Sequence, residues 1–169
     1  RGLGDVYKRQ EYDQPTRFIE LAGEINTAMP RYVVDRLAEG LDRTLGKALS
    51  RSRVLILGLA YKKNVPDIRE SPSLRLMELL IERGADVSYH DPHIAEVPRT
   101  REYGHLKGRR SVAFSADELS GFDAAIVATD HDGVDYEEVA ARVPLLVDTR
   151  NTFGFRGCLL YTSDAADDL

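Results

Sequence analysis

The feature that most constrains the fold is the stretch of residues 53–84, which has the pattern of a strand, a polar loop and a helix. Residues 54–57 are a continuous apolar run, as expected of a strand covered on both faces. Ser71 and Pro72 are typical of a helix start, because a hydroxyl caps the free N–H groups and proline at the first helical position loses no hydrogen bond. The stretch therefore predicts one strand–loop–helix unit, with residues 72–83 helical.

Further strands and short helices alternate along the rest of the chain. We expect strands at 85–90, 111–114, 123–129 and 145–148, and short helices at 117–119 and 136–142. Strands that alternate with helices are typical of parallel sheets with right-handed crossovers. The sequence therefore predicts an α/β fold: a Rossmann-like parallel sheet with flanking helices over about residues 50–156.

Two helical segments are predicted before the first strand, at 16–29 and 31–49. Their apolar residues recur at spacings of three and four, as on one face of a helix: Phe18, Ala22, Ile25 and Met29 in the first, and Val34, Leu37, Leu41 and Leu45 in the second. Pro30 between them is expected to break or kink the helix, or to begin a second one. Residues 11–49 are predicted to be a helical connector that mediates dimerisation; the alternative is a helix packed on its own sheet.

Composition narrows the functional classes. The net charge of −5 argues against nucleic acid or a membrane surface as partner of the whole chain, and no apolar run approaches the ~20 residues of a membrane span. The single cysteine, Cys158, cannot form an internal disulfide, so we expect a cytoplasmic protein. Residues 1–10 and 157–169 lack apolar periodicity, and we expect both to be non-native or disordered tails.

Polar and charged side chains follow every predicted strand. Because the carboxyl ends of parallel strands meet at one edge of a sheet, these side chains should gather where open α/β sheets bind ligands. They are Tyr61, Lys62, Lys63 and Arg69, then His90, Asp91 and His93, then Thr129, Asp130, His131 and Asp132, and finally Thr149, Arg150 and Asn151. Lys62 and Arg150, with the N–H groups at the start of the 72–83 helix, suit a diphosphate. From the residues alone, a loop of solvated charges is the alternative.

Histidine and aspartate cluster after two of the strands, at 90–93 and 130–132. Imidazole and carboxylate groups bind metals, but the spacing alone does not bring the two clusters together. The sequence favours strand-end turns in which Asp91 and Asp130 accept hydrogen bonds from backbone N–H groups. We also expect Asp67 to cap a turn rather than orient Arg69, and Lys63 to be a solvated neighbour rather than a ligand.

Five motifs occur in the order found in one known family. They are FIELAGEINTAMP, GLAYKKNVPDIRESP, YHDPH, ATDHD and VDTRN, spread over residues 11–156. On these motifs the chain resembles the C-terminal domain of the UDP-glucose/GDP-mannose dehydrogenase family of nucleotide-sugar 6-dehydrogenases, slightly closer to the branch that oxidises UDP-N-acetylhexosamines. The resemblance implies that Tyr61, Lys62 and Arg150 contact the UDP-sugar, and that Arg69 reaches across the cleft to NAD.

The resemblance also implies what lies outside this stretch. Family members use NAD to oxidise the C6 alcohol of a UDP-sugar to a carboxylate, through a cysteine in a region N-terminal to the motifs above. GxGxxG is absent and Cys158 falls in a suspected tail. We therefore expect a C-terminal substrate-binding fragment, inactive alone, that forms a homodimer and lacks the N-terminal NAD-binding half. The alternative is a non-catalytic nucleotide-binding or assembly module.

Overall fold

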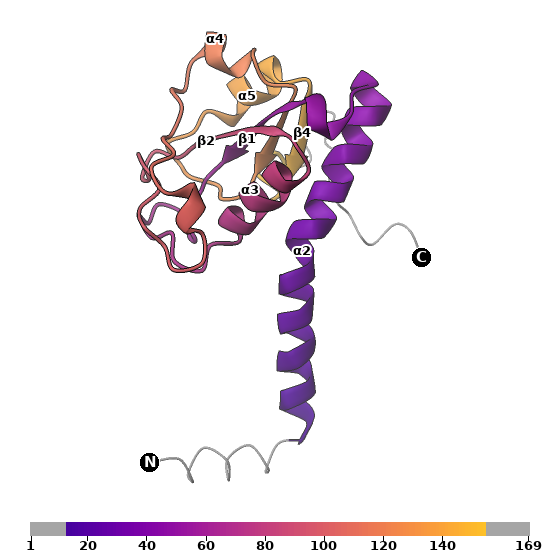
Figure 1. Ribbon diagram of the computed structural model, residues 1–169, viewed down its shortest axis with the longest axis vertical. Coiled ribbons are helices and arrows are strands. Elements are labelled where there is room, and N and C mark those ends of the chain that lie inside the picture. Colours follow the sequence, from indigo (N-terminus) through magenta and orange to yellow (C-terminus); the bar gives the residue numbers. More distant parts are fainter. Residues whose placement is uncertain (1–12, 155–169) are drawn as a thin grey trace.

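The computed structural model describes residues 13–154, apart from the side chains of residues 13–20, 22 and 26. The expected tails, with Cys158, lie outside the described residues. The described elements comprise a long N-terminal helix and a four-stranded sheet with shorter helices on both faces (Figure 1). No helix within residues 13–154 has the length and apolar character needed to cross a bilayer.

The sheet is entirely parallel, with the strand order β2-β1-β3-β4. Its strands are β1 (Arg53–Leu57), β2 (Asp86–His90), β3 (Ala124–Val127) and β4 (Leu145–Asp148). Ile56 at the centre of β1 lies opposite Tyr89 of β2 and Ile126 of β3. The predicted fold class is confirmed, as are four of the five predicted strands.

The two faces of the sheet bury two separate apolar clusters. Alternate residues of a strand point to opposite faces, so Val54 and Ile56 pack under α3 (Pro72–Glu82) and the second half of α2 (Asp13–Leu45). Leu55 and Leu57 pack under α4 (Ala116–Leu119) and α5 (Tyr136–Arg142). The continuous apolar run of β1 is explained by this coverage on both sides.

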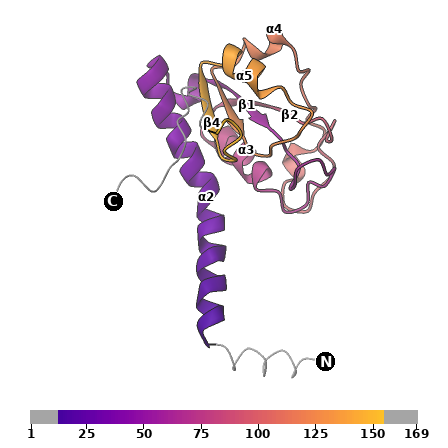
Figure 2. The same cartoon turned by 180° about the vertical axis from the view of Figure 1, so that it is seen from behind.

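The long helix α2 has one buried half and one projecting half. The second half packs on the domain and buries the side chains of Val33, Val34, Leu37 and Leu41. The first half extends away from the domain, and Leu21, Ile25 and Met29 on it are 54%, 51% and 40% exposed (Figures 1 and 2). The expectation that Val34 and Leu41 belong to a subunit contact is therefore wrong, because they pack on their own sheet.

Of the three outcomes expected at Pro30, neither a break nor the start of a second helix occurs, because α2 continues through this residue. Proline removes one helical N–H and bends helices, and the axis of α2 changes direction partway along its length (Figure 2). The helix ends at Leu45 rather than at residue 49. Gly46 has φ +58°, and its N–H donates to the carbonyl of Asp42 at 3.0 Å. A glycine in this left-handed conformation is a common C-terminal cap of helices.

The strand predicted at residues 111–114 is wrong. The N–H of Val112 donates to the carbonyl of Tyr89 in β2 at 2.8 Å, but the N–H of Ser111 donates to the carbonyl of Ala95 at 3.0 Å. Among the described backbone hydrogen bonds, the one from Val112 is the single one that joins residues 111–114 to β2, so no ladder forms on β2. The only described pairing nearby is an isolated antiparallel bridge between Glu96 and Arg110.

Candidate functional site

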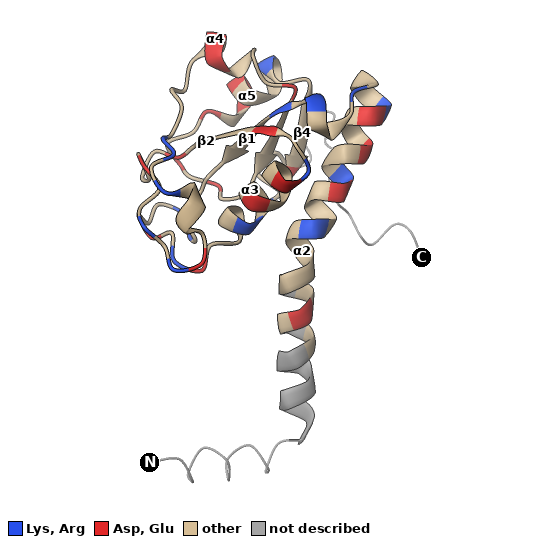
Figure 3. Ribbon diagram, viewed as in Figure 1, with Lys and Arg blue, Asp and Glu red and all other residues tan. Residues whose placement is uncertain are grey.

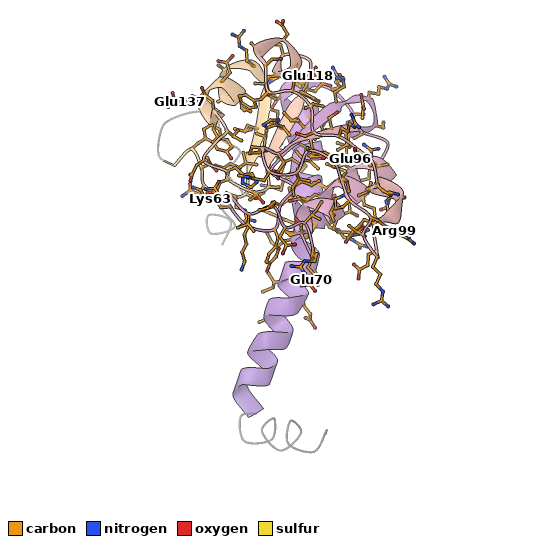
Figure 4. All side chains as sticks on the ribbon, turned by 90° about the vertical axis from the view of Figure 1, so that its left-hand side faces the viewer. Lys63, Glu70, Glu96, Arg99, Glu118 and Glu137 are labelled. Carbon is orange, nitrogen blue, oxygen red and sulfur yellow. The ribbon has the colours of Figure 1, made fainter. Side chains whose placement is uncertain are left out.

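The four strands end at one edge of the sheet, and we call this edge and the loops that follow the strands the rim. The chain passes from β1 to β2 on one side and then returns to β3 on the other side of β1. Open α/β sheets bind ligands at such a reversal, outside the carboxyl ends of the strands. The loops at residues 58–71 and 128–135 flank this position. Figure 3 shows residues of both charges on the loops at the lower left of the domain, and Figure 4 places Lys63 and Glu70 of the first loop far from Glu118 of α4.

Tyr61 and Lys62 present an aromatic ring and a cation to solvent on the loop after β1. The Tyr61 side chain is 45% exposed, while its backbone N–H donates to the carbonyl of Asp67 at 2.7 Å. The Lys62 ammonium lies 5.6 Å from the centroid of the Tyr61 ring. Among the described residues, no carboxylate lies within 4 Å of this ammonium. The pair is therefore accessible to an anionic ligand.

Arg150 is held in place by the end of the neighbouring strand. Its Nε–H donates to the carbonyl of Ala128 at 2.6 Å, and its backbone N–H donates to Oδ1 of Asp148 at 2.9 Å. Oδ2 of the same buried carboxylate accepts from the N–H of Phe153 at 3.1 Å, which fixes the turn. The two Nη groups have no carboxylate within 4 Å among the residues the structure describes. A preorganised guanidinium of this kind suits a phosphate.

Unlike Lys62 and Arg150, Arg69 forms an ion pair with a carboxylate, that of Asp67. Its Nε and Nη2 donate to the two carboxylate oxygens of Asp67 at 3.0 and 2.8 Å, and its backbone N–H donates to Oδ1 at 3.0 Å. Asp67 thus caps a turn, as expected, and also orients Arg69, which was not expected. The hydrogen bonds from the Arg69 side chain and backbone lower the pKa of Asp67 to about 2. The Arg69 side chain is 85% exposed, so it can change partners at little cost.

The start of α3 offers fewer free donors than the sequence suggested. Ser71 caps the helix as expected, and its Oγ accepts from the N–H of Ser73 at 3.3 Å. The N–H of Leu74 donates to the Ser71 carbonyl at 3.2 Å. Ser71 and Ser73 are both buried. Two of the first N–H groups are therefore already occupied, and the cations of the rim remain the main anion-binding groups.

Asp91 is a buried carboxylate that gathers backbone donors from two segments. Its Oδ2 accepts from the N–H groups of Leu59 and Ala60 at 2.6 and 2.9 Å. Its Oδ1 accepts from the N–H groups of His93 and Ile94 at 2.7 and 3.1 Å. Burial alone would raise the pKa of Asp91, but these hydrogen bonds and the nearby imidazole of His131 lower it. The expectation that Asp91 caps a turn is confirmed.

The two histidine–aspartate clusters meet, contrary to what the spacing suggested. Nε2 of His131 lies 3.1 Å from Oδ2 of Asp91, and both side chains are fully buried. Nδ1 of His131 accepts from the N–H of Asn64 at 2.9 Å, and its ring lies 4.9 Å from that of His93. Because β1 lies between β2 and β3, the residues that follow β2 and β3 can meet over the end of β1. Predicting this contact requires the strand order, which could not be read from the sequence.

Lys63 is ion-paired across the rim rather than simply solvated. Its ammonium lies 2.5 Å from Asp132 and 3.7 Å from Asp130, and the hydrogen bond to Asp132 raises the pKa of Lys63. Asn64 and Asp132 also exchange two hydrogen bonds, at 2.6 and 3.1 Å. For Asp130 the structure shows this ion pair, not the expected turn cap. Within residues 13–154, no group of three or more histidine, cysteine or acidic side chains is placed to hold a metal ion.

Comparisons with known proteins agree on one family. A family model described as the UDP-glucose/GDP-mannose dehydrogenase family, UDP binding domain, matches residues 55–154. A UDP-N-acetyl-D-mannosamine dehydrogenase of Methanococcus maripaludis is 34% identical over 146 residues, which cover 80% of this chain and 30% of the relative. A UDP-glucose 6-dehydrogenase of Haloferax volcanii is 35% identical over 150 residues, which cover 87% of this chain and 33% of the relative.

Solved structures show the same relationship. A UDP-D-ManNAc dehydrogenase from Pyrococcus horikoshii matches with a TM-score of 0.65 and 26% identity, over 84% of this chain and 32% of that one. A UDP-glucose dehydrogenase from Pyrobaculum islandicum matches with a TM-score of 0.54 and 32% identity, over 78% of this chain and 31% of that one. The chain thus spans about a third of the length of these relatives. The resemblance inferred from the five motifs is confirmed, as is its closeness to UDP-N-acetylhexosamine dehydrogenases.

Proposed function

Because the chain belongs to the UDP-glucose/GDP-mannose dehydrogenase family, we propose that its rim binds the UDP part of a nucleotide sugar whose C6 alcohol is oxidised to a carboxylate with NAD. The observation that carries this proposal is the presence of two unpaired cations, Lys62 and Arg150, on the rim of one parallel sheet. Neither has a carboxylate within 4 Å among the described residues.

Each proposed contact follows from the chemistry of the side chain. The Nη groups of Arg150 can donate in parallel to two phosphate oxygens, while its Nε stays bonded to Ala128. Lys62 adds a compact charge to the diphosphate, and Tyr61 offers an exposed ring and hydroxyl. Such an arrangement recognises a diphosphate on a larger group, which a nucleotide sugar provides.

Arg69 is proposed to contact NAD held by another domain. It extends from the rim with 85% of its side chain exposed, and Asp67 keeps it extended until a ligand arrives. A dinucleotide phosphate would compete with the Asp67 carboxylate for the same guanidinium. This role accounts for a bidentate ion pair on a surface where such pairs contribute little to stability.

The complete reaction is proposed to need a partner half. The chain spans about a third of the matched relatives, and its sequence has no GxGxxG motif and no cysteine other than Cys158. We propose that an N-terminal half supplies the NAD site and the nucleophile, and that this chain alone is inactive. The names of the relatives favour a UDP-N-acetylhexosamine as substrate. The proposed compartment is the cytoplasm, where a lone cysteine stays reduced.

A homodimer is also proposed, through the projecting half of α2. Leu21, Ile25 and Met29 recur at intervals of four and form an exposed apolar stripe. Between residues 21 and 30, Glu24 is the only charged residue. We propose that this stripe packs against the same helix of a second copy of the chain.

Calorimetric titration with UDP and with uridine tests the proposed function. Since the two cations would contact the diphosphate, UDP should bind and uridine should bind at least about tenfold more weakly, the loss expected for one charge-assisted contact. The UDP affinity should fall as salt is added, because added ions screen partly exposed charges. Equal affinity for both ligands would contradict a diphosphate site.

A further inference from the structure

We propose that His131 and Asp91 are positioning residues that fix the loop at residues 59–64 in the shape that receives the UDP-sugar. This inference rests on the proposed function, because it assigns a purpose to groups that lie behind Tyr61 and Lys62. Both side chains are fully buried, so they do not themselves touch a ligand bound at the rim. Their action is on the loop backbone.

The pair holds both ends of the loop. At the start, Oδ2 of Asp91 accepts from the N–H groups of Leu59 and Ala60. At the end, Nδ1 of His131 accepts from the N–H of Asn64 at 2.9 Å. Tyr61 and Lys62 lie between these attachments. Because the two attaching side chains also bond to each other, the loop ends are fixed relative to β2 and β3 by one connected unit.

The hydrogen-bond pattern requires one form of His131. Its Nδ1 accepts the Asn64 N–H, so this atom carries no hydrogen. Its Nε2 then carries the hydrogen and donates to Oδ2 of Asp91. The neutral imidazole with hydrogen on Nε2 therefore satisfies both neighbours. A doubly protonated ring would set its Nδ1–H against the Asn64 N–H.

This chemistry predicts which replacements retain the loop. In His131→Gln, one amide can accept from Asn64 and donate to Asp91, so both contacts can persist. In His131→Leu, a side chain of similar bulk makes neither contact. A residue that only filled space would accept leucine as well as glutamine, which separates positioning from packing.

Two measurements on the ligand-free chain test the pair directly. Nitrogen–proton correlation spectra of the histidine rings should show hydrogen on Nε2 and none on Nδ1 of His131. Amide exchange at Asn64 should be at least about tenfold faster in His131→Leu than in the wild type, as expected when one hydrogen bond is lost, and close to wild type in His131→Gln. If His131→Leu does not fold, His131→Asn serves instead, because its shorter side chain cannot reach both partners.

UDP affinity then tests the purpose of the pair. His131→Leu should weaken UDP binding about tenfold or more, and His131→Gln should restore most of it. Val139→Ala, at a fully buried position of α5, is the control for a general loss of stability and should keep the wild-type affinity while folded. Wild-type affinity in a folded His131→Leu protein would overturn this inference alone. Failure of the wild-type chain to bind UDP would overturn the proposed function and the inference with it.

Discussion

Gly58 and Thr129 approach each other so closely at the rim that no side chain fits between them. A Cβ at position 58 would lie 2.6 Å from the Cβ of Thr129, and Gly58 has φ +83°. The Oγ1–H of Thr129 also donates to the carbonyl of Ala60 at 2.7 Å. The loop after β3 thus contacts the first residues of the loop after β1. Glycine at position 58 is required both by the backbone conformation and by this contact.

Gly58→Ala should therefore lower the stability of the domain. A left-handed conformation costs an ordinary residue about 1–3 kcal/mol, and overpacking adds about 1–3 kcal/mol. Urea unfolding should show a loss of about 2 kcal/mol or more relative to the wild type. Gly133→Ala is the control, because nothing lies within 4 Å of a Cβ at that position. Equal midpoints for the two variants would contradict this account.

The sequence predicted the elements whose cause is local. Ser71 and Pro72 marked the start of α3, and continuous apolar runs marked β1 and β4. The strand at residues 111–114 could not be excluded locally, because its failure depends on where Ala95 and Tyr89 lie in space. The end of α2 was missed although Gly46 was a local signal for it.

The candidate site was only partly predictable, because some of its contacts depend on how distant segments lie in space. The gathering of charges at the rim follows from parallel strands alone, and so the sequence placed Lys62 and Arg150 there. The contact between Asp91 and His131 joins residues 40 positions apart and depends on the strand order. Likewise, only packing decides that Val34 is buried while Ile25 is exposed, since both lie on apolar helical positions.

The buried Asp91 carboxylate should make stability depend on acidity. Its pKa is lowered in the folded state, so at low pH the unfolded chain binds more protons and stability rises with pH. The contribution is full above the unfolded pKa of about 4 and is lost as pH falls through the lower folded value. Urea unfolding between about pH 5 and pH 3 should therefore show a smaller loss for Asp91→Asn than for the wild type.

Asp91→Asn should also be less stable than the wild type at neutral pH, because an amide cannot accept all the hydrogen bonds of the carboxylate. The exposed Asp42→Asn variant is the control and should keep the wild-type dependence on pH. An Asp91→Asn protein with the wild-type pH slope would contradict the assignment.

The exposed stripe on α2 should mediate self-association. Ile25→Glu places a charge at the centre of the stripe and should weaken the dimer at least about tenfold in sedimentation equilibrium, because an unpaired charge would be buried. Thr27→Glu places the same charge on the opposite side of the helix and should leave association unchanged. A wild-type chain that remains monomeric at high concentration would refute the proposed dimer.

The chain alone should not oxidise a UDP-sugar. Oxidation to the acid through a thiohemiacetal needs a thiolate beside the sugar C6, and Cys158 is the only thiol in the sequence. Incubation with NAD and UDP-N-acetylhexosamines or UDP-glucose should give no NADH absorbance above the enzyme-free blank. Steady NADH formation that persists in Cys158→Ser would contradict the proposal that an N-terminal half supplies the NAD site and the nucleophile.

The central claim is that Lys62 and Arg150 together bind a nucleoside diphosphate at the rim. Calorimetric titration with UDP tests it most directly, in Lys62→Ala, Arg150→Ala and two control variants. The controls are Arg51→Ala and Arg142→Ala, which remove exposed cations that precede β1 and β4 and so lie at the opposite edge of the sheet. Each rim variant should lose about 1.5–3 kcal/mol, or roughly 10- to 150-fold in affinity, while both controls bind as the wild type does. Equal UDP affinity in all five proteins would contradict the claim.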